Sequence, residues 1–484
     1  MTTIKLDPGA ALLLDALHGA GHAAYAVGGC VRDSLLGLDP HDWDLCTSAR
    51  PEQVMALFGE EKCIPTGLQH GTVTVKQGGR LYETTTFRTE GAYSDGRHPD
   101  AVCFVPDVQE DLARRDFTIN AMAYSAEEGL IDPFGGRDDL AAHLVRAVGE
   151  PERRFEEDAL RILRLYRFAA RFGFAIDPAT GAAARALGPH LDCVSAERIQ
   201  EELLKLLAAP RPGSYLEPAV LAVVLPELEP EKQPEQFAEL CRTIDRIEPT
   251  AENVPARLAA LLCPLGEAGA RKALRKLKCS NALTDEVTAL EREAGGGAGS
   301  FLLPRSRDRW AGSSSEDRPL GWDPAAAGNR AGDGMACNSN DRRQWRMQEV
   351  AVGAAASDTQ AVRSGCWEPQ PELVSDQTLM AKRLLGRYEL PTIKRLTALC
   401  SAWHPEQTGA FAALRAEAER LTAENACCRV SQLAVNGRDL MAAGVSPGPG
   451  LRQVLNALLE AVITGQTPNE KDALLAAAAQ FSAS

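Results

Sequence analysis

Two aspartates flank a tryptophan in the segment GGCVRDSLLGLDPHDWDLCTSA, which covers residues 28–49. The residues WDLCT (43–47) have the composition of a strand, and side chains two positions apart on a strand point to the same face. Asp42 and Asp44 are therefore expected to project together, with Trp43 in the core. Two carboxylates so close repel each other unless cations neutralise them, and a pair of Mg²⁺ ions roughly 3.5–4 Å apart serves this purpose in phosphoryl transfer. The sequence predicts Asp42 and Asp44 as magnesium ligands.

A glycine pair upstream of the aspartates suits a phosphate group. Gly28 and Gly29 precede a helical stretch, VRDSLLG (31–37), so backbone N–H groups there can approach phosphates with no Cβ in the way. Arg32 can add a charge-assisted contact. A third carboxylate would complete the catalytic site, and Glu83 in the β-rich run LYETTTF is the candidate. The alternative for Glu83 is an exposed residue on an edge strand.

Length, charge and cysteine usage restrict the class of protein. The chain has 484 residues, enough for several domains, and a formal net charge of −14, so a nucleic-acid partner must meet a local basic patch. None of the 13 cysteines forms a C-x-x-C pair, which is typical of a reducing cytosol. The first residues, MTTIKLDPGA, do not resemble a signal segment, and no apolar run approaches ~20 residues. We expect a cytoplasmic protein with no membrane partner.

The periodicity of the chain divides it into a mixed part and a helical part. Up to about residue 145, strand and helix patterns alternate, and two β-rich runs meet at Gly78-Gly79, which predicts a hairpin. Helical periodicity dominates afterwards, as in FEEDALRILRLYRFAARFGF (155–174) and SAERIQEELLKLLA (195–208). The predicted fold class is α+β: an N-terminal head with a small mixed β-sheet and helices, followed by all-helical parts.

One segment departs from both patterns. Residues 296–370 are rich in Gly, Arg, Ser and Asp and have no sustained period, which predicts a low-complexity, disordered insertion or a stretch translated from the wrong reading frame. Because the segment and its margin also hold four of the six tryptophans, the alternative is a basic, aromatic RNA-binding loop. Helical periodicity resumes near Asp376.

Five motifs resemble those of one known family, in the order in which that family carries them. The segment 28–49 resembles the first motif of the tRNA nucleotidyltransferase and bacterial poly(A) polymerase family, class II of the polymerase-β-like superfamily. The other four are EDLARRDFTINAMAY (110–124), DPFGGRDDL (132–140), RRFEEDALRILRLYRFAARFGF (153–174) and RIQEELLKLL (198–207). A less specific match covers residues 437–462. The resemblance implies a catalytic head (1–145), a helical neck with the nucleotide-selecting motif (146–215), a helical body (216–295), the insertion (296–370) and a tRNA-binding body and tail (371–484).

The second motif is expected to contact the sugar and the phosphates. We predict that Arg115 meets the triphosphate and that Asp116 accepts a hydrogen bond from a ribose hydroxyl, since an acceptor for the 2′-OH distinguishes ribonucleotides from deoxyribonucleotides. The family uses this motif for ribose recognition, and Asn120 is expected to bind the nucleotide with it. The alternative is a surface ion-pair cluster of Arg114, Arg115 and Asp116.

The pattern E-D-x-x-R at Glu157, Asp158 and Arg161 has two interpretations. On a single helix, Glu157, Arg161 and Arg164 would share one face, and a Glu-to-Arg helix pair of roughly 0.2–0.5 kcal/mol is the simpler one. Within the family pattern, these four residues contact the nucleotide. Asp158 then accepts from the exocyclic amine that cytosine and adenine share, and Arg161 donates to the adjacent ring nitrogen. Uracil and guanine, which present a carbonyl and an N–H there, would be rejected.

The body lacks a feature that many relatives carry. In those relatives a metal-dependent phosphohydrolase domain with a His-Asp pair follows the neck. Here Cys263-Pro264 stands where that pair is expected, and residues 220–295 contain no histidine. We therefore expect a degenerate body without phosphohydrolase activity.

The resemblance implies a Mg²⁺-dependent enzyme that adds C and A nucleotides, from CTP and ATP, to the 3′ end of tRNA without a template. Poly(A) polymerases share the head, but they tend to be basic and this chain is acidic. An enzyme that adds only CC or only the terminal A is a further alternative, as is a catalytically silent RNA-binding protein. The expected partners are CTP, ATP and the 3′ end and acceptor arm of tRNA, with no DNA.

Two segments supply local positive charge for RNA. They are KALRKLK (272–278) and MAKRLLGRYELPTIKRL (380–396). The alternative for both is an ordinary solvated helix face.

Overall fold

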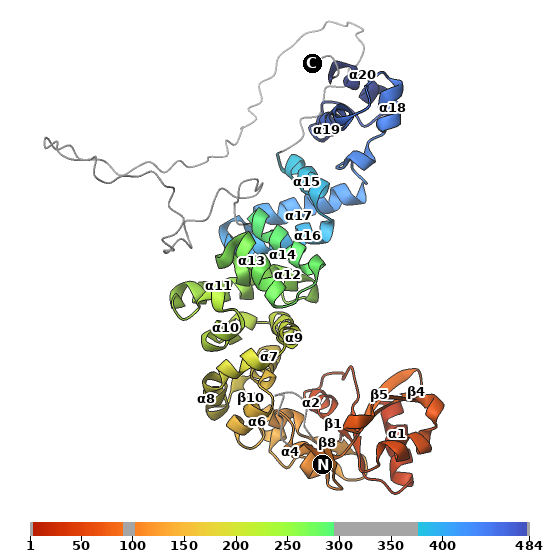
Figure 1. The fold of residues 1–484 in the computed structure, drawn as a ribbon, viewed down its shortest axis with the longest axis vertical. Helices are drawn as coiled ribbons and strands as arrows, with labels where there is room; N and C mark the ends of the chain where they lie inside the picture. The colour runs from red at the N-terminus through yellow and green to blue at the C-terminus, as the bar shows by residue number, and fades with distance from the viewer. Residues whose placement is uncertain (1–2, 91–101, 295–375, 482–484) are drawn as a thin grey trace, which may run out of the picture.

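The computed structural model describes residues 3–90, 102–294 and 376–481 of the chain. The strands gather at one end of the molecule, and helices follow one another from there to the C-terminal helices at the opposite end (Figure 1). Within the described ranges we call residues 3–145 the head, 146–215 the neck, 216–428 the body and 429–481 the tail. None of the described helices is both long and apolar enough to cross a membrane.

A seven-stranded sheet forms the framework of the head, in the order β3-β4-β5-β2-β1-β8-β9. Strands β2 and β5 are parallel, and all other neighbouring pairs are antiparallel. Its strands are β1 (Ala24–Val27), β2 (Leu45–Thr47), β3 (Cys63–Gly67), β4 (Thr72–Gln77), β5 (Arg80–Thr86), β8 (Ala123–Ser125) and β9 (Gly129–Ile131). Two small sheets pair β6 (Arg88–Glu90) with β7 (Val102–Phe104) and β10 (Leu144–Val145) with β11 (Ala175–Ile176). The mixed sheet and the helices beyond it confirm the α+β prediction.

Apolar side chains cover both faces of the sheet at β1. Ala24 and Ala26 belong to one core cluster, whereas Tyr25 and Val27 belong to another, as the alternation of side chains along a strand requires. Helices α1 (Pro8–Gly19) and α3 (Pro51–Phe58) contribute to the first cluster, and α4 (Val108–Ala113) contributes to the second. The other helices of the head are α2 (Gly29–Leu35) and α5 (Gly136–Ala141). Burial on both faces fixes the position of the residues that follow β1.

The hairpin prediction is confirmed, whereas the start of the second strand was predicted two residues too early. β4 and β5 meet at Gly78-Gly79, and both glycines have positive φ, as a two-residue hairpin turn requires. β2 begins at Leu45 rather than at Trp43. Even so, the backbone N–H of Val27 donates to the Asp44 carbonyl at 3.0 Å, which extends the ladder by one residue, and Trp43 is buried as predicted.

The neck contains the helices α6 (Pro151–Glu157), α7 (Leu160–Phe172), α8 (Pro178–Ala186) and α9 (Ala196–Leu207). The prediction of one continuous helix over 155–174 is wrong, because Asp158 is extended, with φ −148° and ψ 102°. Its Oδ1 accepts a hydrogen bond from the backbone N–H of Leu160 at 3.1 Å. Aspartate favours such local bonds over the helical ladder, so α6 ends where this carboxylate starts α7.

The body continues on both sides of residues 295–375. Its helices are α10 (Pro218–Val224), α11 (Pro234–Arg246), α12 (Val254–Leu262), α13 (Gly266–Lys276), α14 (Asn281–Ala294), α15 (Asp376–Arg387), α16 (Leu390–Trp403) and α17 (Thr408–Ala423). Helix α16 packs against α11, α12 and α14, so both parts share one core. α15 begins at Asp376, where helical periodicity was predicted to resume. The predicted insertion, 296–370, lies outside the described residues.

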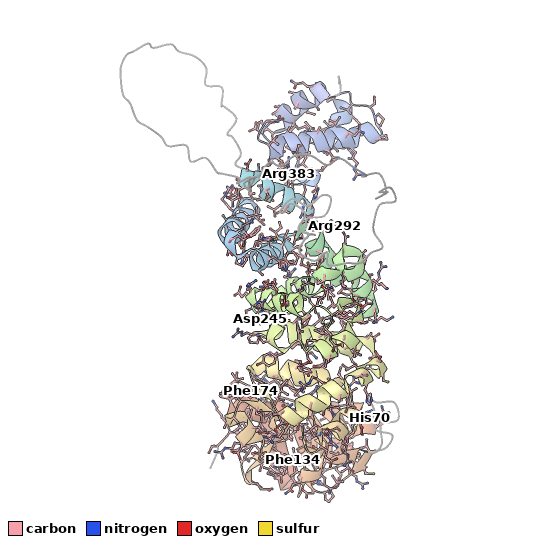
Figure 2. All side chains as sticks on the ribbon, turned by 90° about the vertical axis from the view of Figure 1, so that its left-hand side faces the viewer. His70, Phe134, Phe174, Asp245, Arg292 and Arg383 are labelled. Carbon is pink, nitrogen blue, oxygen red and sulfur yellow. The ribbon has the colours of Figure 1, made fainter. Side chains whose placement is uncertain are left out.

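The tail has a hydrophobic core of its own. Helices α18 (Gly437–Ala442), α19 (Pro449–Ile463) and α20 (Lys471–Phe481) enclose this cluster, which is separate from the core shared by head, neck and body. Arg383 of α15, labelled in Figure 2, lies near the tail. It pairs with Glu460 of α19, which links body and tail.

Candidate nucleotide-binding site

A pocket of about 460 Å³ lies between the head and the neck helices α7 and α9. Eight arginines and three aspartates line it, so it carries a local excess of positive charge in a chain of net charge −14. Such an excess attracts a polyanion, for example a triphosphate. Ten of the thirteen predicted site residues line the pocket, which leaves out Asp42, Glu83 and Glu157. The lining residues are Gly28, Gly29, Arg32, Asp44, Arg114, Arg115, Asp116, Asn120, Asp158, Leu160, Arg161, Arg164, Arg167, Phe168, Arg171 and Arg198.

Gly28 forms the corner between β1 and α2. Its φ of +79° is a left-handed conformation that favours glycine. A Cβ at this position would lie 2.8 Å from Nη1 of Arg115, so the guanidinium lies against the backbone of the corner. Arg115 also pairs at 3.4 Å with Asp111, which is fully buried. The corner and the arginine are thus held side by side, as the predicted phosphate contacts need.

The three predicted catalytic carboxylates lie near the start of β2. The parallel register pairs Leu45 with Thr84, so Asp44 and Glu83 directly precede paired residues of neighbouring strands. Partial burial and the negative charges of Glu83 and Asp42, opposed by Arg115, together raise the pKa of Asp44 to about 6. Glu83 is exposed, as the alternative expected, but β5 lies between β4 and β2 and is therefore not an edge strand.

The oxygen donors of this carboxylate group fit a hard divalent cation. Mg²⁺ is usually held by one or two carboxylates together with substrate phosphates, rather than by an all-protein cage. In keeping with this, the described residues contain no group of three or more acidic, histidine or cysteine side chains that could hold a metal ion alone. A cation would also remove the repulsion that Glu83 and Asp42 exert on Asp44. The ligand role of Asp42 and Asp44 stays a prediction: Asp44 lines the pocket, whereas Asp42 does not line it and is exposed, with its Oδ1 3.4 Å from Nδ1 of His41.

Asp116 joins the head to the neck. Its Oδ2 accepts hydrogen bonds from Nε and Nη2 of Arg164 at 2.9 and 2.6 Å, and its Oδ1 accepts from Phe117 N and Asn120 Nδ2. Burial by itself would raise the pKa of Asp116, but Arg164 and the hydrogen bond from Asn120 hold it well below its usual range. Because a carboxylate offers about four acceptor positions, a ribose hydroxyl could bind Asp116 only in place of one of these donors.

The neighbouring arginines have a different acidic partner. Arg114 and Arg115 both pair with Asp111, at 2.9 and 3.4 Å, and not with Asp116. The alternative of a surface cluster of these three motif residues is therefore wrong. Asp111 was missed because a carboxylate at i−3 and i−4 from two arginines is common on solvated helices.

Arg32 is buried between the head and the neck, with only 3% of its surface exposed. Its guanidinium carbon lies 5.3 Å from the ring centre of Phe168 and 4.8 Å from that of Phe172, both on α7. Its Nε donates to Asp33 at 2.8 Å, and its Nη1 donates to Oδ1 of Asn120. Arg32 therefore couples α2 to α7, a role that its predicted phosphate contact did not anticipate.

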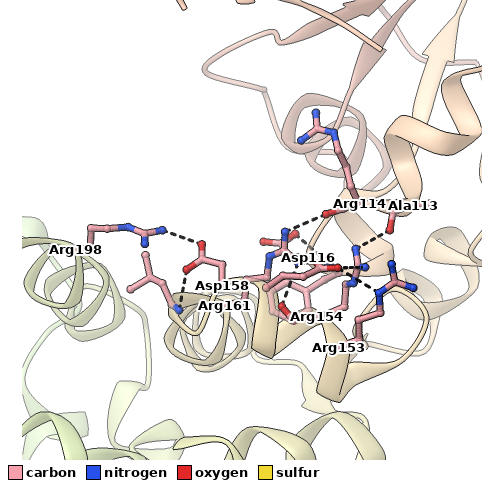
Figure 3. Close-up of polar contacts among 11 residues, drawn as sticks. Ala113, Arg114, Asp116, Arg153, Arg154, Asp158, Arg161 and Arg198 are labelled. Atoms are coloured by element: carbon pink, nitrogen blue, oxygen red, sulfur yellow. Dashed lines mark hydrogen bonds and ion pairs between the residues drawn. The ribbon is translucent and has the colours of Figure 1, made fainter. Parts of the chain in front are cut away.

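Among the E-D-x-x-R residues, Glu157 and Arg161 pair as their spacing suggests, whereas Asp158 has its partner outside the motif (Figure 3). Arg161 donates to Glu157 at 2.8 Å and to the backbone carbonyls of Arg154 and Arg114. The ion pair of the simpler interpretation is therefore present between Glu157 and Arg161, but it joins the end of α6 to the start of α7 rather than two turns of one helix. Asp158 instead accepts from Nη2 of Arg198 at 2.8 Å, across from α9.

Several cationic residues of the pocket were not among the predicted site residues. Arg167, Arg171 and Arg198 line it, and each pairs with an acidic residue: Glu202, Asp33 and Asp158, respectively. The signal was present on α7, where arginines recur at positions 161, 164, 167 and 171, a helical spacing that places them along one side.

The two basic body segments differ in their ion pairs. In α15 and α16, Arg383, Arg387, Lys394 and Arg395 pair with Glu460, Glu293, Glu419 and Glu286. These pairs favour the interpretation of this segment as ordinary helix surface. In α13, Lys272, Arg275 and Lys276 are exposed, and no ion pair involves them within the described part of the chain.

Comparisons with known proteins give concordant results. The model described as "Poly A polymerase head domain" matches residues 24–146, "Probable RNA and SrmB- binding site of polymerase A" matches 173–231, and "tRNA nucleotidyltransferase domain 2 putative" matches 383–478. The CCA-adding enzyme of Limosilactobacillus fermentum is 33% identical over 97% of this chain and 96% of its own length. The CCA-adding enzyme of Geobacillus stearothermophilus is 32% identical over 96% of this chain and 94% of its own.

Solved structures resemble the whole described fold. The crystal structure of the Bacillus stearothermophilus CCA-adding enzyme in complex with CTP superposes with a TM-score of 0.69 at 30% identity, covering 98% of both chains. The Thermotoga maritima CCA-adding enzyme complexed with tRNA has the same fold, with a TM-score of 0.60 at 20% identity. Near-complete coverage at more than 30% identity to curated relatives leads to one conclusion: the chain belongs to the CCA-adding enzyme family of tRNA nucleotidyltransferases.

Proposed function

We propose that this protein adds the nucleotides C, C and A, taken from CTP and ATP, to the 3′ end of tRNA. The observation that carries the proposal is the full-length similarity to CCA-adding enzymes, together with an arginine-lined pocket that adjoins the carboxylate group. We also propose that it works in the cytoplasm and that its metal ion is Mg²⁺.

Asp42 and Asp44 would hold the metal, with Glu83 beside them. When bound, Mg²⁺ lowers the pKa of the attacking 3′-hydroxyl of RNA and stabilises the leaving pyrophosphate. The side chains of the protein therefore supply charge and orientation, and no side-chain nucleophile is needed. Asp44 keeps access to solvent and lines the pocket, so phosphate oxygens can share its cation.

The nucleotide would lie between the glycine corner and the neck. Arg115, held against Gly28, would bind the triphosphate, and Gly29 would allow its close approach. Asp158 would accept from the exocyclic amine of C or A, while Arg161 would donate to the ring nitrogen beside it. Three of the five N–H donors of Arg161 serve protein acceptors, so two are left for a base.

Incubation with tRNA that lacks its CCA end tests the proposal, with CTP alone, ATP alone or both. We expect two C additions with CTP alone, completion with one A when both are present, and arrest afterwards. Long A tails without CTP would show a poly(A) polymerase, arrest after CC with both nucleotides would show a CC-adding enzyme, and addition of A only to tRNA ending in CC would show an A-adding enzyme. Binding without any incorporation would show a silent RNA-binding protein, and each of these results would overturn the proposal.

A further inference from the structure

Asp158 and Arg161 are the two neck residues proposed to contact the base. Each forms its ion pair with a third residue and not with the other. Arg161 is held by Glu157, which belongs to the same motif. Asp158 is held by Arg198, which lies 40 residues further along the chain on a different helix. The two side chains that would read one base are thus positioned independently.

We propose that Arg198 is a positioning residue that determines nucleotide specificity through Asp158. This inference rests on the proposed function, because it assigns to Arg198 the orientation of the carboxylate that reads the base. Arg198 belongs to α9 and is the first residue of the motif RIQEELLKLL (198–207), for which the sequence predicted no contact with a base.

The backbone around Asp158 explains why the carboxylate needs an external partner. Asp158 lies in the extended break between α6 and α7, so no helical turn fixes its side chain. Its Oδ1 accepts from the N–H of Leu160 at 3.1 Å, and its Oδ2 accepts from Nη2 of Arg198 at 2.8 Å (Figure 3). With one donor on each oxygen, the plane of the carboxylate is set, and about two acceptor positions stay open.

The surroundings of the ion pair support a role in the pocket rather than in packing alone. Both Asp158 and Arg198 line the pocket, and their side chains are 16% and 21% exposed. The pair is therefore enclosed enough to hold one geometry and open enough to meet a ligand. A carboxylate fixed in one orientation accepts a hydrogen bond from the amine of C or A. The carbonyl of U or G would instead face another acceptor, which disfavours binding of these bases.

Removal of Arg198 should allow the carboxylate of Asp158 to rotate, while Asp158 itself stays in place. A carboxylate free to rotate can turn away from the carbonyl of a wrong base, so the penalty against U and G falls. A lysine at this position keeps the charge but not the planar fork, and so should preserve part of the effect.

The test compares the full-length wild type, Arg198→Ala and Arg198→Lys on tRNA that lacks CCA. The quantities measured are kcat and KM for CTP, UTP, ATP and GTP. We expect Arg198→Ala to lower the preference for CTP over UTP and for ATP over GTP about tenfold, and Arg198→Lys to lie in between. Lys205→Ala is the matched control, because Lys205 lies on the exposed side of the same helix and pairs at 3.8 Å with Glu201. This control should keep the wild-type preference.

A double-mutant cycle with Asp158→Ala separates action through Asp158 from an independent contact. If Arg198 acts through Asp158, the double variant should select no worse than Asp158→Ala alone. A further tenfold loss in the double variant would overturn the inference, and so would an Arg198→Ala variant that melts earlier but stays fully selective. If Arg198→Ala does not fold, Arg198→Lys and Arg198→Gln carry the same comparison. A wild type that adds neither C nor A would instead refute the proposed function itself.

Discussion

The carboxylates beside β2 and those at the junction of head and neck are balanced in opposite ways. Asp44 and Glu83 form no ion pair within the described part of the chain, and their mutual repulsion contributes to the raised pKa of Asp44. In the neck junction, Asp116, Glu157 and Asp158 each contact an arginine. The difference teaches that Asp44 and Glu83 leave their negative charge for an external cation, whereas the junction uses its charge internally to orient side chains.

The largest effect on nucleotide incorporation is expected when one of the predicted metal ligands beside β2 is removed. Asp44→Ala or Asp42→Ala should lower nucleotide incorporation at least ~1,000-fold, because the cation loses a ligand. Melting temperature without metal should stay unchanged or rise, since the substitution relieves like-charge repulsion. Asp39→Ala, an exposed aspartate on the same loop, serves as the control and should keep near-normal turnover. Near-normal turnover in both test variants would show that the carboxylate site lies elsewhere.

The opposite stability result is expected for a balanced carboxylate. Asp116→Ala leaves Arg164 without its partner at the head–neck junction, and breaking this partly buried pair costs about 1–3 kcal/mol of unfolding free energy. Because the pKa of Asp116 is lowered on folding, its contribution is present above about pH 4 and is lost as the pH falls. Denaturant titrations at pH 7 and at pH 2.5 should therefore show a difference from wild type that shrinks in acid. If Asp116→Ala is as stable as wild type at pH 7, the junction carboxylates do not differ from those beside β2 in their effect on stability.

Base selection should change when Asp158 is removed. Asp158→Ala should lower the CTP-to-UTP and ATP-to-GTP preference at least about tenfold, as expected when a cognate base loses one polar contact worth about 1–3 kcal/mol. Affinity for tRNA should barely change. The substitution leaves Arg198 unpaired, whereas Arg161 keeps Glu157. The measurement is incorporation from competing nucleotides, together with the melting temperature. A variant that keeps the wild-type nucleotide preference and only melts at a lower temperature would show that E-D-x-x-R stabilises the neck and does not select the base.

The repulsion in the head predicts a pH dependence of stability without metal. The pKa of Asp44 is about 6 in the folded protein and about 4 in an unfolded chain, so the folded state binds more protons between these values. Stability from this group therefore falls as the pH rises through that window. Asp44→Asn should raise the melting temperature in EDTA more at pH 7.5 than at pH 5, and added Mg²⁺ should reduce the gain. A gain that is larger at pH 5 would contradict the assignment.

The smallest effect concerns the unpaired cations of α13. Replacing Lys272, Arg275 and Lys276 by alanine should weaken tRNA binding several-fold and make its salt dependence less steep, because phosphate contacts release counterions. Lys394→Ala, which removes a cation already paired with Glu419, is the control and should leave both quantities unchanged. If both variants bind tRNA with the same affinity and the same salt dependence, α13 does not contact tRNA and is an ordinary helix surface.

Local rules explain the parts of the fold that were predicted correctly. Gly78-Gly79 specifies the hairpin because both positions need positive φ, and alternation along β1 specifies a strand buried on two faces. The break at Asp158 was missed because helical periodicity continues through it, and one side-chain hydrogen bond to Leu160 decides it. The site was predicted as a set of residues, and ten of those thirteen line one pocket.

The sequence alone therefore determined which chemical groups the site has: two aspartates beside a strand, a glycine corner, and a neck motif with carboxylates and arginines. Only the tertiary structure decided their partners. Arg161 pairs with Glu157 four residues away, but Asp158 pairs with Arg198 and Asp116 with Arg164, over separations of 40 and 48 residues. Arginine side chains are long and flexible, so their partners depend on which elements pack side by side, and spacing along the chain does not encode that proximity.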